Sequence, residues 1–259
     1  MPAHTPTTAR RWPPQALLVG YSGLLASVAG FVNAVALLVL AFPVGNLTAV
    51  TTELGMNTAR PNAWLYEGHV LGAILLGFLA GTAIAGAVLA PTYANTGPRH
   101  AAVLLTEAVL LLLAAVGIEE TVIQAQIAAM GMGIEKAVVQ VLLAAAALGL
   151  QNGLSSSIRG VTIRTTHFTG TITDLGLMLG RSRRHGIEKW KVAVLTMTLL
   201  LFIVGGAAGL LLGARLHGYA LIIPAAACGA VAVASVLHDR VHRESGGLTS
   251  QPLGQEQFS

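Results

Sequence analysis

Six stretches of this 259-residue chain are almost wholly apolar, and short polar segments separate them. Each approaches the roughly 20 residues that a helix needs to cross the hydrocarbon core of a bilayer. The pattern predicts an all-α, polytopic membrane protein with about six transmembrane helices. The stretches are residues 17–40, 68–90, 101–117, 137–154, 192–214 and 219–237.

The polar break after the first stretch recurs after the fourth. Residues 42–48 read FPVGNLT, and residues 167–173, which begin 125 positions later, read HFTGTIT. Because each copy contains three spans, the second copy should lie upside down relative to the first, as an inverted-topology 3+3 repeat. The predicted divisions are a disordered cytoplasmic tail (1–16), a first repeat (17–118), an external connector (119–136), a second repeat (137–238) and a disordered cytoplasmic tail (239–259).

Both breaks are too polar to face lipid and too apolar for ordinary loops. Irregular backbone at membrane depth is tolerated where it is buried in protein or lines a wet cavity. We therefore predict, after the first and fourth spans, a Gly-hinged turn followed by a short broken or re-entrant helix, at 48–54 and 171–179. The N-terminus of such a helix favours an anion or a carbonyl oxygen. The alternative is a pair of ordinary helix caps near the two membrane faces.

These breaks and two polar positions within the spans supply the candidate solute-binding residues. The asparagines of the spans can instead form hydrogen bonds between helices. Asp174 can instead lie in the first turn of a helix, where its negative charge interacts favourably with the helix dipole. The candidates are Asn33, Gly45, Asn46, Thr48, Asn152, Thr169, Gly170, Thr171 and Asp174.

One carboxylate, Glu107, lies inside an apolar span. An ionisable group at that depth is expensive and is by default a functional candidate, here for carrying a coupling proton. The alternative places Glu107 near the cytoplasmic interface, a few residues after Arg99 and His100.

Small residues recur four positions apart in the second span of each copy. Such spacing lets helix backbones approach closely, either at the centre of the molecule or across a homodimer interface. The positions are Gly77, Gly81 and Ala85 in the first copy and Gly205, Gly209 and Gly213 in the second.

Charge fixes the expected orientation. Only 10% of residues are charged, against about 25% in soluble domains. With the N-terminus in the cytoplasm, twelve Lys and Arg fall inside and three (Arg60, Lys136 and Arg215) fall outside. Both termini should therefore be cytoplasmic, and the net charge of +4 reflects topology and lipid contact rather than nucleic-acid binding. We expect no enzyme, cofactor or metal site, because the chain lacks nucleophile–base, metal-ligand and phosphate-loop motifs.

Four motifs resemble those of the YoaK-like family of bacterial inner-membrane proteins, a domain of unknown function. They are Ala29-Gly30-Phe31-Val32-Asn33-Ala34, Val44-Gly45-Asn46, Gln151-Asn152 and the run TTHFTGTITD at 165–174. The chain departs from the family where Asn33 replaces the usual Asp and Val44 the usual Thr. The resemblance implies about six transmembrane helices in a bacterial inner membrane and no established activity.

The inverted pair of breaks favours a small secondary transporter or facilitator for a small polar or anionic solute, bound between the two breaks. A channel-like pore would share the repeat but keep a continuous polar path. A non-transporting scaffold or lipid-binding protein would use the small-residue helix faces and the basic cluster Arg181, Arg183 and Arg184.

Overall fold

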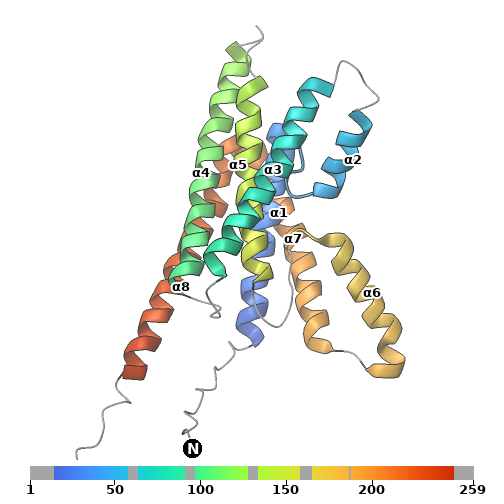
Figure 1. Ribbon diagram of the computed structural model, residues 1–259, viewed down its shortest axis with the longest axis vertical. Helices are drawn as coiled ribbons and strands as arrows, with labels where there is room; N and C mark the ends of the chain where they lie inside the picture. Colours follow the sequence, from blue (N-terminus) through green and yellow to red (C-terminus); the bar gives the residue numbers. More distant parts are fainter. Residues whose placement is uncertain are drawn as a thin grey trace, which may run out of the picture.

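The computed structural model describes residues 15–57, 64–90, 97–127, 134–157, 165–186 and 188–247. Within these ranges the chain is helical, with six long helices and two shorter ones, α2 and α6 (Figure 1). The predicted disorder of residues 1–14 and 248–259 concerns positions outside these ranges. The elements are α1 (Gln15–Leu40), α2 (Leu47–Asn57), α3 (Trp64–Leu89), α4 (Pro98–Ile127), α5 (Ile134–Ser156), α6 (Phe168–His185), α7 (Lys189–Leu216), the 3₁₀ turn η1 (His217–Leu221) and α8 (Ile222–Gly247).

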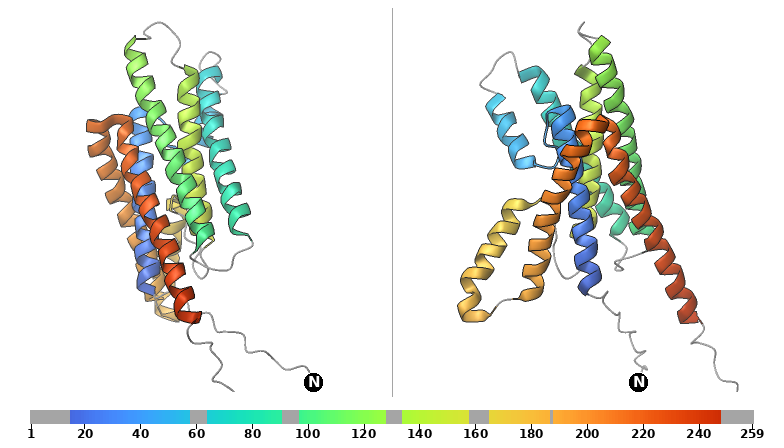
Figure 2. Two further views of the ribbon diagram at one scale, coloured as in Figure 1. Left: turned by 90° about the vertical axis from the view of Figure 1, so that its left-hand side faces the viewer. Right: turned by 180° about the vertical axis from the view of Figure 1, so that it is seen from behind.

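The surface of the long helices is apolar, as a lipid environment requires. Leu79 and Leu211 expose 66% and 71% of their areas, and many other large aliphatic side chains are exposed as well. Five helical stretches of the described chain are long and apolar enough to cross a membrane. The last, Lys189–Leu237, contains α7 and the first part of α8, and these two helices run in opposite directions on either side of η1 (Figure 2). The prediction of an all-α, polytopic membrane protein is confirmed.

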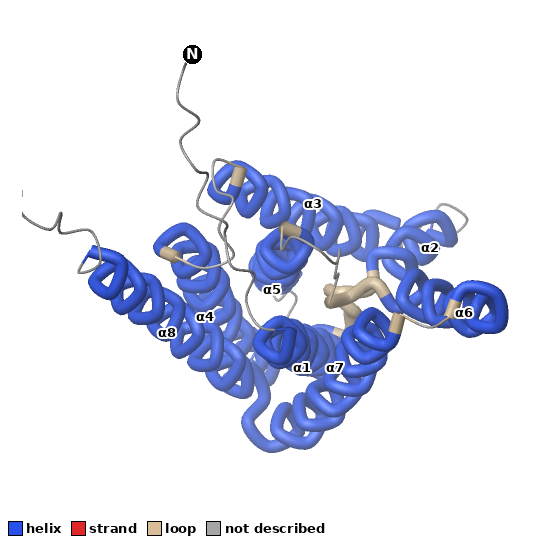
Figure 3. The backbone as a smooth tube through the Cα atoms, turned by 90° about the horizontal axis from the view of Figure 1, so that it is seen from below, coloured by secondary structure: helices blue, strands red, loops and turns tan. Residues whose placement is uncertain are grey.

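The long helices pack as two reciprocal pairs, α1 with α7 and α3 with α5 (Figure 3). Each pair joins the first span of one half to the second span of the other. A Cβ on Gly30 of α1 would overlap the backbone carbonyl oxygen of Phe202 in α7. A Cβ on Gly149 of α5 would likewise overlap the carbonyl oxygen of Phe78 in α3. This exchange of partners is the contact pattern that two inverted halves should produce.

The predicted small-residue faces form these pairs. Gly81 of α3 lies against the backbone of Ala146, and Gly205 of α7 lies against that of Ser27. Because the faces are covered within one chain, they do not provide the homodimer interface that their spacing allowed. Helices α4 and α8 pack against each other and cover the opposite side of the bundle from α2 and α6 (Figure 3).

The two short helices are arranged as a diverging pair. Both begin near the mid-height of the long helices; α2 then runs to one end of the bundle and α6 to the other (Figure 1). α2 packs on α3, and α6 packs on α7. The short helices are longer than predicted: α2 covers Leu47–Asn57 and α6 covers Phe168–His185.

Helices also extend into two segments that the sequence assigned elsewhere. α8 continues to Gly247, so the first part of the predicted disordered tail (239–247) is helical. α4 continues to Ile127, into the predicted external connector, of which residues 128–133 lie outside the described ranges. Hydropathy marks the end of an apolar stretch, whereas a helix can continue as long as polar residues keep good helix propensity.

Basic residues gather at the end of the bundle where α1 starts and α8 finishes. Arg99, Lys189 and Lys191 lie at or near helix starts there, and Arg181 and Arg240 lie towards helix ends. Arg215 lies at the opposite end, in the last turn of α7. This distribution agrees with the bias from which the orientation was predicted.

Helix α1 ends at a strained residue that returns the chain towards mid-height. Ala41 has φ 64°, a left-handed conformation that costs a residue with a Cβ about 1–2 kcal/mol. Ala41→Gly is therefore expected to stabilise the protein by roughly 1 kcal/mol. Thermal unfolding in detergent measures the effect, with Ala83→Gly on the exposed face of α3 as a control that should destabilise. A lower melting temperature for Ala41→Gly would contradict the expectation.

Candidate functional site

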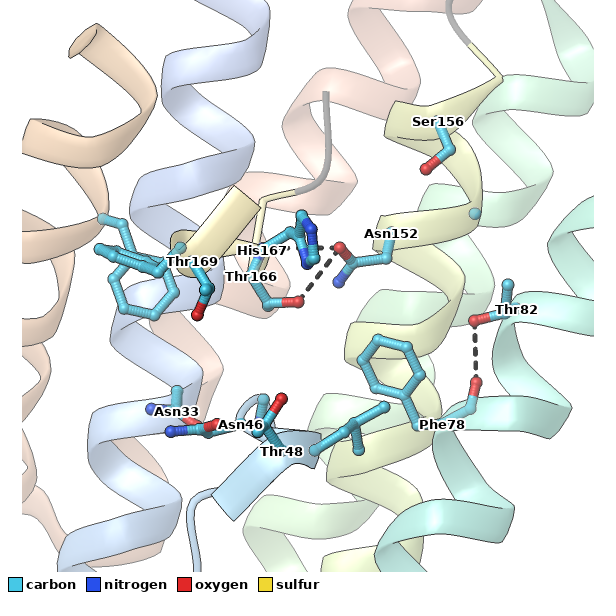
Figure 4. Close-up of a pocket in the computed structure, with 15 residues that line it drawn as sticks. Asn33, Asn46, Thr48, Phe78, Thr82, Asn152, Ser156, Thr166, His167 and Thr169 are labelled. Carbon is cyan, nitrogen blue, oxygen red and sulfur yellow. Dashed lines mark hydrogen bonds between the residues drawn. The ribbon is translucent and has the colours of Figure 1, made fainter. Parts of the chain in front are cut away.

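A cavity of about 800 Å³ lies where the two short helices begin. Its wall includes the first residues of both, Leu47 and Thr48 of α2 and Phe168 and Thr169 of α6. Figure 4 shows the polar side chains of the two breaks turned towards a common space between α1 and α5. Small-molecule sites typically have volumes of this size. The remaining lining residues are Asn33, Gly45, Asn46, Phe78, Thr82, Asn152, Gly153, Ser156, Thr166, His167 and Phe202.

The first break is tied to the helix that precedes it. The backbone N–H of Gly45 donates a hydrogen bond of 2.8 Å to the Oδ1 atom of Asn33 in α1. A Cβ on Gly45 would lie 3.1 Å from this oxygen and 3.1 Å from Leu148, which is tighter than most side-chain contacts. Asn46 then caps α2, because its Oδ1 atom accepts a bond from the N–H of Ala49.

The second break is tied in the same manner. The Oδ1 atom of Asn152 in α5 accepts hydrogen bonds from the hydroxyl of Thr166 (3.2 Å) and from its backbone N–H (3.5 Å). The amide nitrogen of Asn152 donates to the carbonyl of Leu148. One asparagine in the first span of each half thus holds the turn that follows it (Figure 4).

The structural register of the two breaks differs from the register of the sequence repeat. Gly45 corresponds to Thr166, since each is the residue held by an asparagine and each precedes its short helix by two positions. These residues also meet, because a Cβ on Gly45 would lie 3.4 Å from the Thr166 methyl carbon. The prediction that Gly170 forms the hinge is wrong: Gly170 is helical, in the first turn of α6. Its missing side chain instead accommodates the ring of His167, which a Cβ would overlap.

The remaining candidates of the second break lie away from the cavity lining. Thr171 is helical, and its hydroxyl donates to the carbonyl oxygen of His167. Asp174 is exposed and falls in the second turn of α6, so the prediction that it interacts with the dipole in a first turn is wrong. The error follows from the start of α6, which lies three residues before the predicted start. Asn33, Gly45, Asn46, Thr48, Asn152 and Thr169 are brought together in the lining.

Aromatic rings and neutral polar groups dominate the cavity wall. Phe78 and Phe202 come from the equivalent helices α3 and α7, and the Phe202 ring meets Phe168 edge-on at 4.5 Å between centroids. The lining residues in the described part of the chain include no Asp, Glu, Lys or Arg. No side chain caps the start of α6, so its first N–H groups add positive potential on this side.

Several lining residues escaped the sequence prediction. Phe78 and Phe202 stand at matching places in the two copies, but an apolar residue in a span gives no sign of facing a cavity. Thr82 donates from its hydroxyl to the carbonyl of Gly149 (3.1 Å) and so joins α3 to α5 beside the cavity. The contact between Asn152 and Thr166 could not be predicted without knowing which turn packs against which helix.

Glu107 does not line the cavity. It is fully buried in α4, among residues that pack against α5 and α8. Its side chain has no exposed area, and its depth relative to the cytoplasmic interface stays a prediction.

Residues 22–234 match the model of a family described as proteins of unknown function, DUF1275. The match covers most of the chain, which therefore belongs to this family. The comparisons found no matching curated protein and no matching solved structure. The family relationship supplies no activity.

Proposed function

We propose that this membrane protein is a small secondary transporter or facilitator that binds a small polar or anionic solute between its two helix breaks. The observation that carries the proposal is the 800 Å³ cavity bounded by the starts of α2 and α6. Discontinuous helices that meet near mid-height at the junction of two repeats are the usual site of solute binding in secondary transporters.

The chemistry of the cavity wall limits which classes of solute the site can bind. Two helix N-termini meet the cavity, and the described residues of its lining include no carboxylate, which favours a solute carrying acceptor oxygens, such as a small carboxylate or amide. The phenyl rings of Phe78, Phe168 and Phe202 suit an apolar or planar part of the same molecule. Hydroxyl and amide groups on Thr48, Asn46 and Thr169 supply neutral hydrogen bonds.

A thermal-shift screen tests the cavity as the binding site. The detergent-solubilised protein is screened against small carboxylates, amides and polyols; a binding solute at 100 times its Kd would stabilise the protein by about 2.7 kcal/mol. Thr48→Phe fills the cavity and should abolish the shift. Thr51→Phe, on the same exposed helix but outside the lining, should preserve it. A shift unaffected by Thr48→Phe would place binding elsewhere and contradict the proposal.

Transport is tested with the same solute in proteoliposomes. A carrier predicts uptake that saturates with concentration and is lost in Thr48→Phe. A channel-like pore predicts flux that rises without saturation. Binding without flux in either direction would favour a non-transporting scaffold or lipid-binding protein.

Location and orientation complete the proposal. The gathering of basic residues at the end where α1 starts supports cytoplasmic N- and C-termini. A bacterial inner membrane, and the narrower likeness to YoaK-like proteins, follow from the motif resemblance. Protease access to epitope tags at either terminus of inverted and right-side-out vesicles would test the orientation.

A further inference from the structure

A second buried polar region lies outside the cavity, where α1, α4, α5 and α8 meet. At its centre Glu107 of α4 has no exposed area, and neither of its carboxyl oxygens accepts a hydrogen bond from an N–H or O–H group within the described part of the chain. Its neighbours are the phenol of Tyr21 from α1 and the thiol of Cys228 from α8, which is a weak donor to the carboxyl. Buried polar atoms are normally paired, so an unpaired carboxyl calls for an explanation.

Other unpaired polar atoms accompany Glu107. His100 is buried two helical turns earlier on α4, about 10 Å along the same face, and neither of its ring nitrogens has a partner among the described residues. The hydroxyl of Ser22, next to Tyr21, also has no partner among these residues. Leu104, between the two titratable residues of α4, belongs to one apolar cluster with Leu25, which connects this region to α1.

Surrounding charges do not neutralise the carboxyl. The facing groups are Tyr21 from α1, Cys228 from α8 and, on α4 itself, His100. From α5 the buried polar side chains are the amides of Gln140 and Gln151, and its titratable residues, Glu135 and Lys136, lie in its first turn. From η1, His217 and Tyr219 are exposed to the surroundings. Arg99 lies at the start of α4, and the carboxyl of Asp239 from α8 lies beside it, 3.8 Å from the Cβ position of Gly97.

An unpaired carboxylate in this setting would cost several kcal/mol, whereas the neutral acid buries a polar group only. A metal ion is a poor alternative, since the described residues contain no group of three His, Cys, Asp or Glu that could hold one. We propose that Glu107 is a proton-binding site, separate from the cavity, that exchanges its proton with the aqueous face at the start of α4 through His100.

The exchange is a relayed proton transfer, because about 10 Å along α4 is too far for a direct one. Water at the start of α4 protonates the imidazole of His100, and the imidazolium gives its proton to a water molecule that enters transiently between the two side chains. A water molecule of the same chain gives a proton to the carboxylate of Glu107, which becomes the neutral acid. Release reverses these steps. Gln151 provides a connection to the cavity: its amide nitrogen donates to the carbonyl of Leu25 (2.6 Å), and the next residue, Asn152, lines the cavity. Coupling of the proton to a solute rests on the proposed function; proton binding itself does not.

Labelling with the hydrophobic reagent dicyclohexylcarbodiimide tests the site without any solute. The reagent adds to neutral carboxylic acids in apolar surroundings, giving an acylurea that peptide mass spectrometry locates. Glu107 should be labelled at neutral pH and much less at alkaline pH, whereas the exposed Glu53 and Glu188 should stay unlabelled. Absence of labelling at Glu107, or labelling independent of pH, would overturn the proposal.

Infrared spectroscopy of the reconstituted protein tests the exchange route. A carbonyl band of a protonated carboxyl should be present in the wild type and absent in Glu107→Gln. In deuterated buffer this band should shift, and His100→Gln should slow the shift at least tenfold. The matched control is His69→Gln. His69 lies near the start of α3, in a different helix from His100, and its replacement should leave the rate unchanged. Equal exchange rates in His100→Gln and the wild type would exclude the histidine route. The carbodiimide labelling and the infrared exchange need no solute, so a failed solute screen would not affect either result.

Discussion

Replacing Asn152 or Asn33 by alanine is expected to release the corresponding helix break from its span. In Asn33→Ala the buried N–H of Gly45 loses its acceptor, the Oδ1 atom of Asn33 at 2.8 Å. Leaving such a group unpaired costs about 1–3 kcal/mol. In Asn152→Ala the hydroxyl and the backbone N–H of Thr166 lose their acceptor, the Oδ1 atom of Asn152. Since 1.4 kcal/mol is a factor of ten, binding in the cavity should weaken about tenfold or more.

Thiol accessibility measures this opening before any solute is known. The chain has one cysteine, Cys228, and it is buried, so Thr165→Cys introduces a single further thiol, at a position that is buried while the second break is held closed. Reaction with a membrane-impermeant maleimide should be about tenfold faster when Asn152→Ala is added, because the break is open more often. Ser155→Ala removes only a bond within α5 and should leave the rate unchanged. An equal acceleration by both changes would contradict the tether.

Asn33 offers a sharper control. Asn33→Asp keeps an acceptor oxygen for Gly45 and restores the residue that the resembling family usually carries, so it should retain the closed break where Asn33→Ala does not. Thermal unfolding and cavity accessibility should both follow this order. If Asn33→Asp behaved like Asn33→Ala, the hydrogen bond would not be what holds the first break.

The second large effect is expected at the glycines between paired helices. A Cβ on Gly149 would overlap the carbonyl oxygen of Phe78, and one on Gly81 would overlap that of Ala146. Backbone atoms cannot rotate away, so α3 and α5 would have to separate. Gly149→Ala and Gly81→Ala should each destabilise the protein by about 1–3 kcal/mol. The double variant should lose less than the sum, because the first change already opens the shared interface.

Unfolding in mixed micelles provides the measurement, and the chain provides a control. Gly86 lies in α3 with no atom within 4 Å of its Cβ position, so Gly86→Ala should leave stability unchanged or raise it slightly. Gly30→Ala in the equivalent α1–α7 pair should match Gly149→Ala. A large difference between these two would argue against equivalent halves.

Hydropathy and composition were sufficient for the membrane fold because they are local properties. Runs of about 20 apolar residues can satisfy their backbone in lipid only as helices, whatever their neighbours are. The two polar breaks and the small-residue stripes also stand out locally, and six of the candidate residues at the breaks and spans come together in one cavity wall. The sequence alignment of the two breaks, however, pairs Gly45 with Gly170, whereas in the structure the residue equivalent to Gly45 is Thr166.

The sequence alone determined that this chain is a bundle of membrane helices interrupted twice at related places. The tertiary structure decided which spans pair, where each break turns back, and that Glu107 lies apart from the cavity. The physical reason is that helix pairing depends on which backbones can approach, as at Gly30 with Phe202 and Gly149 with Phe78. Those contacts join residues far apart in the chain, and neither hydropathy nor a repeated motif records them.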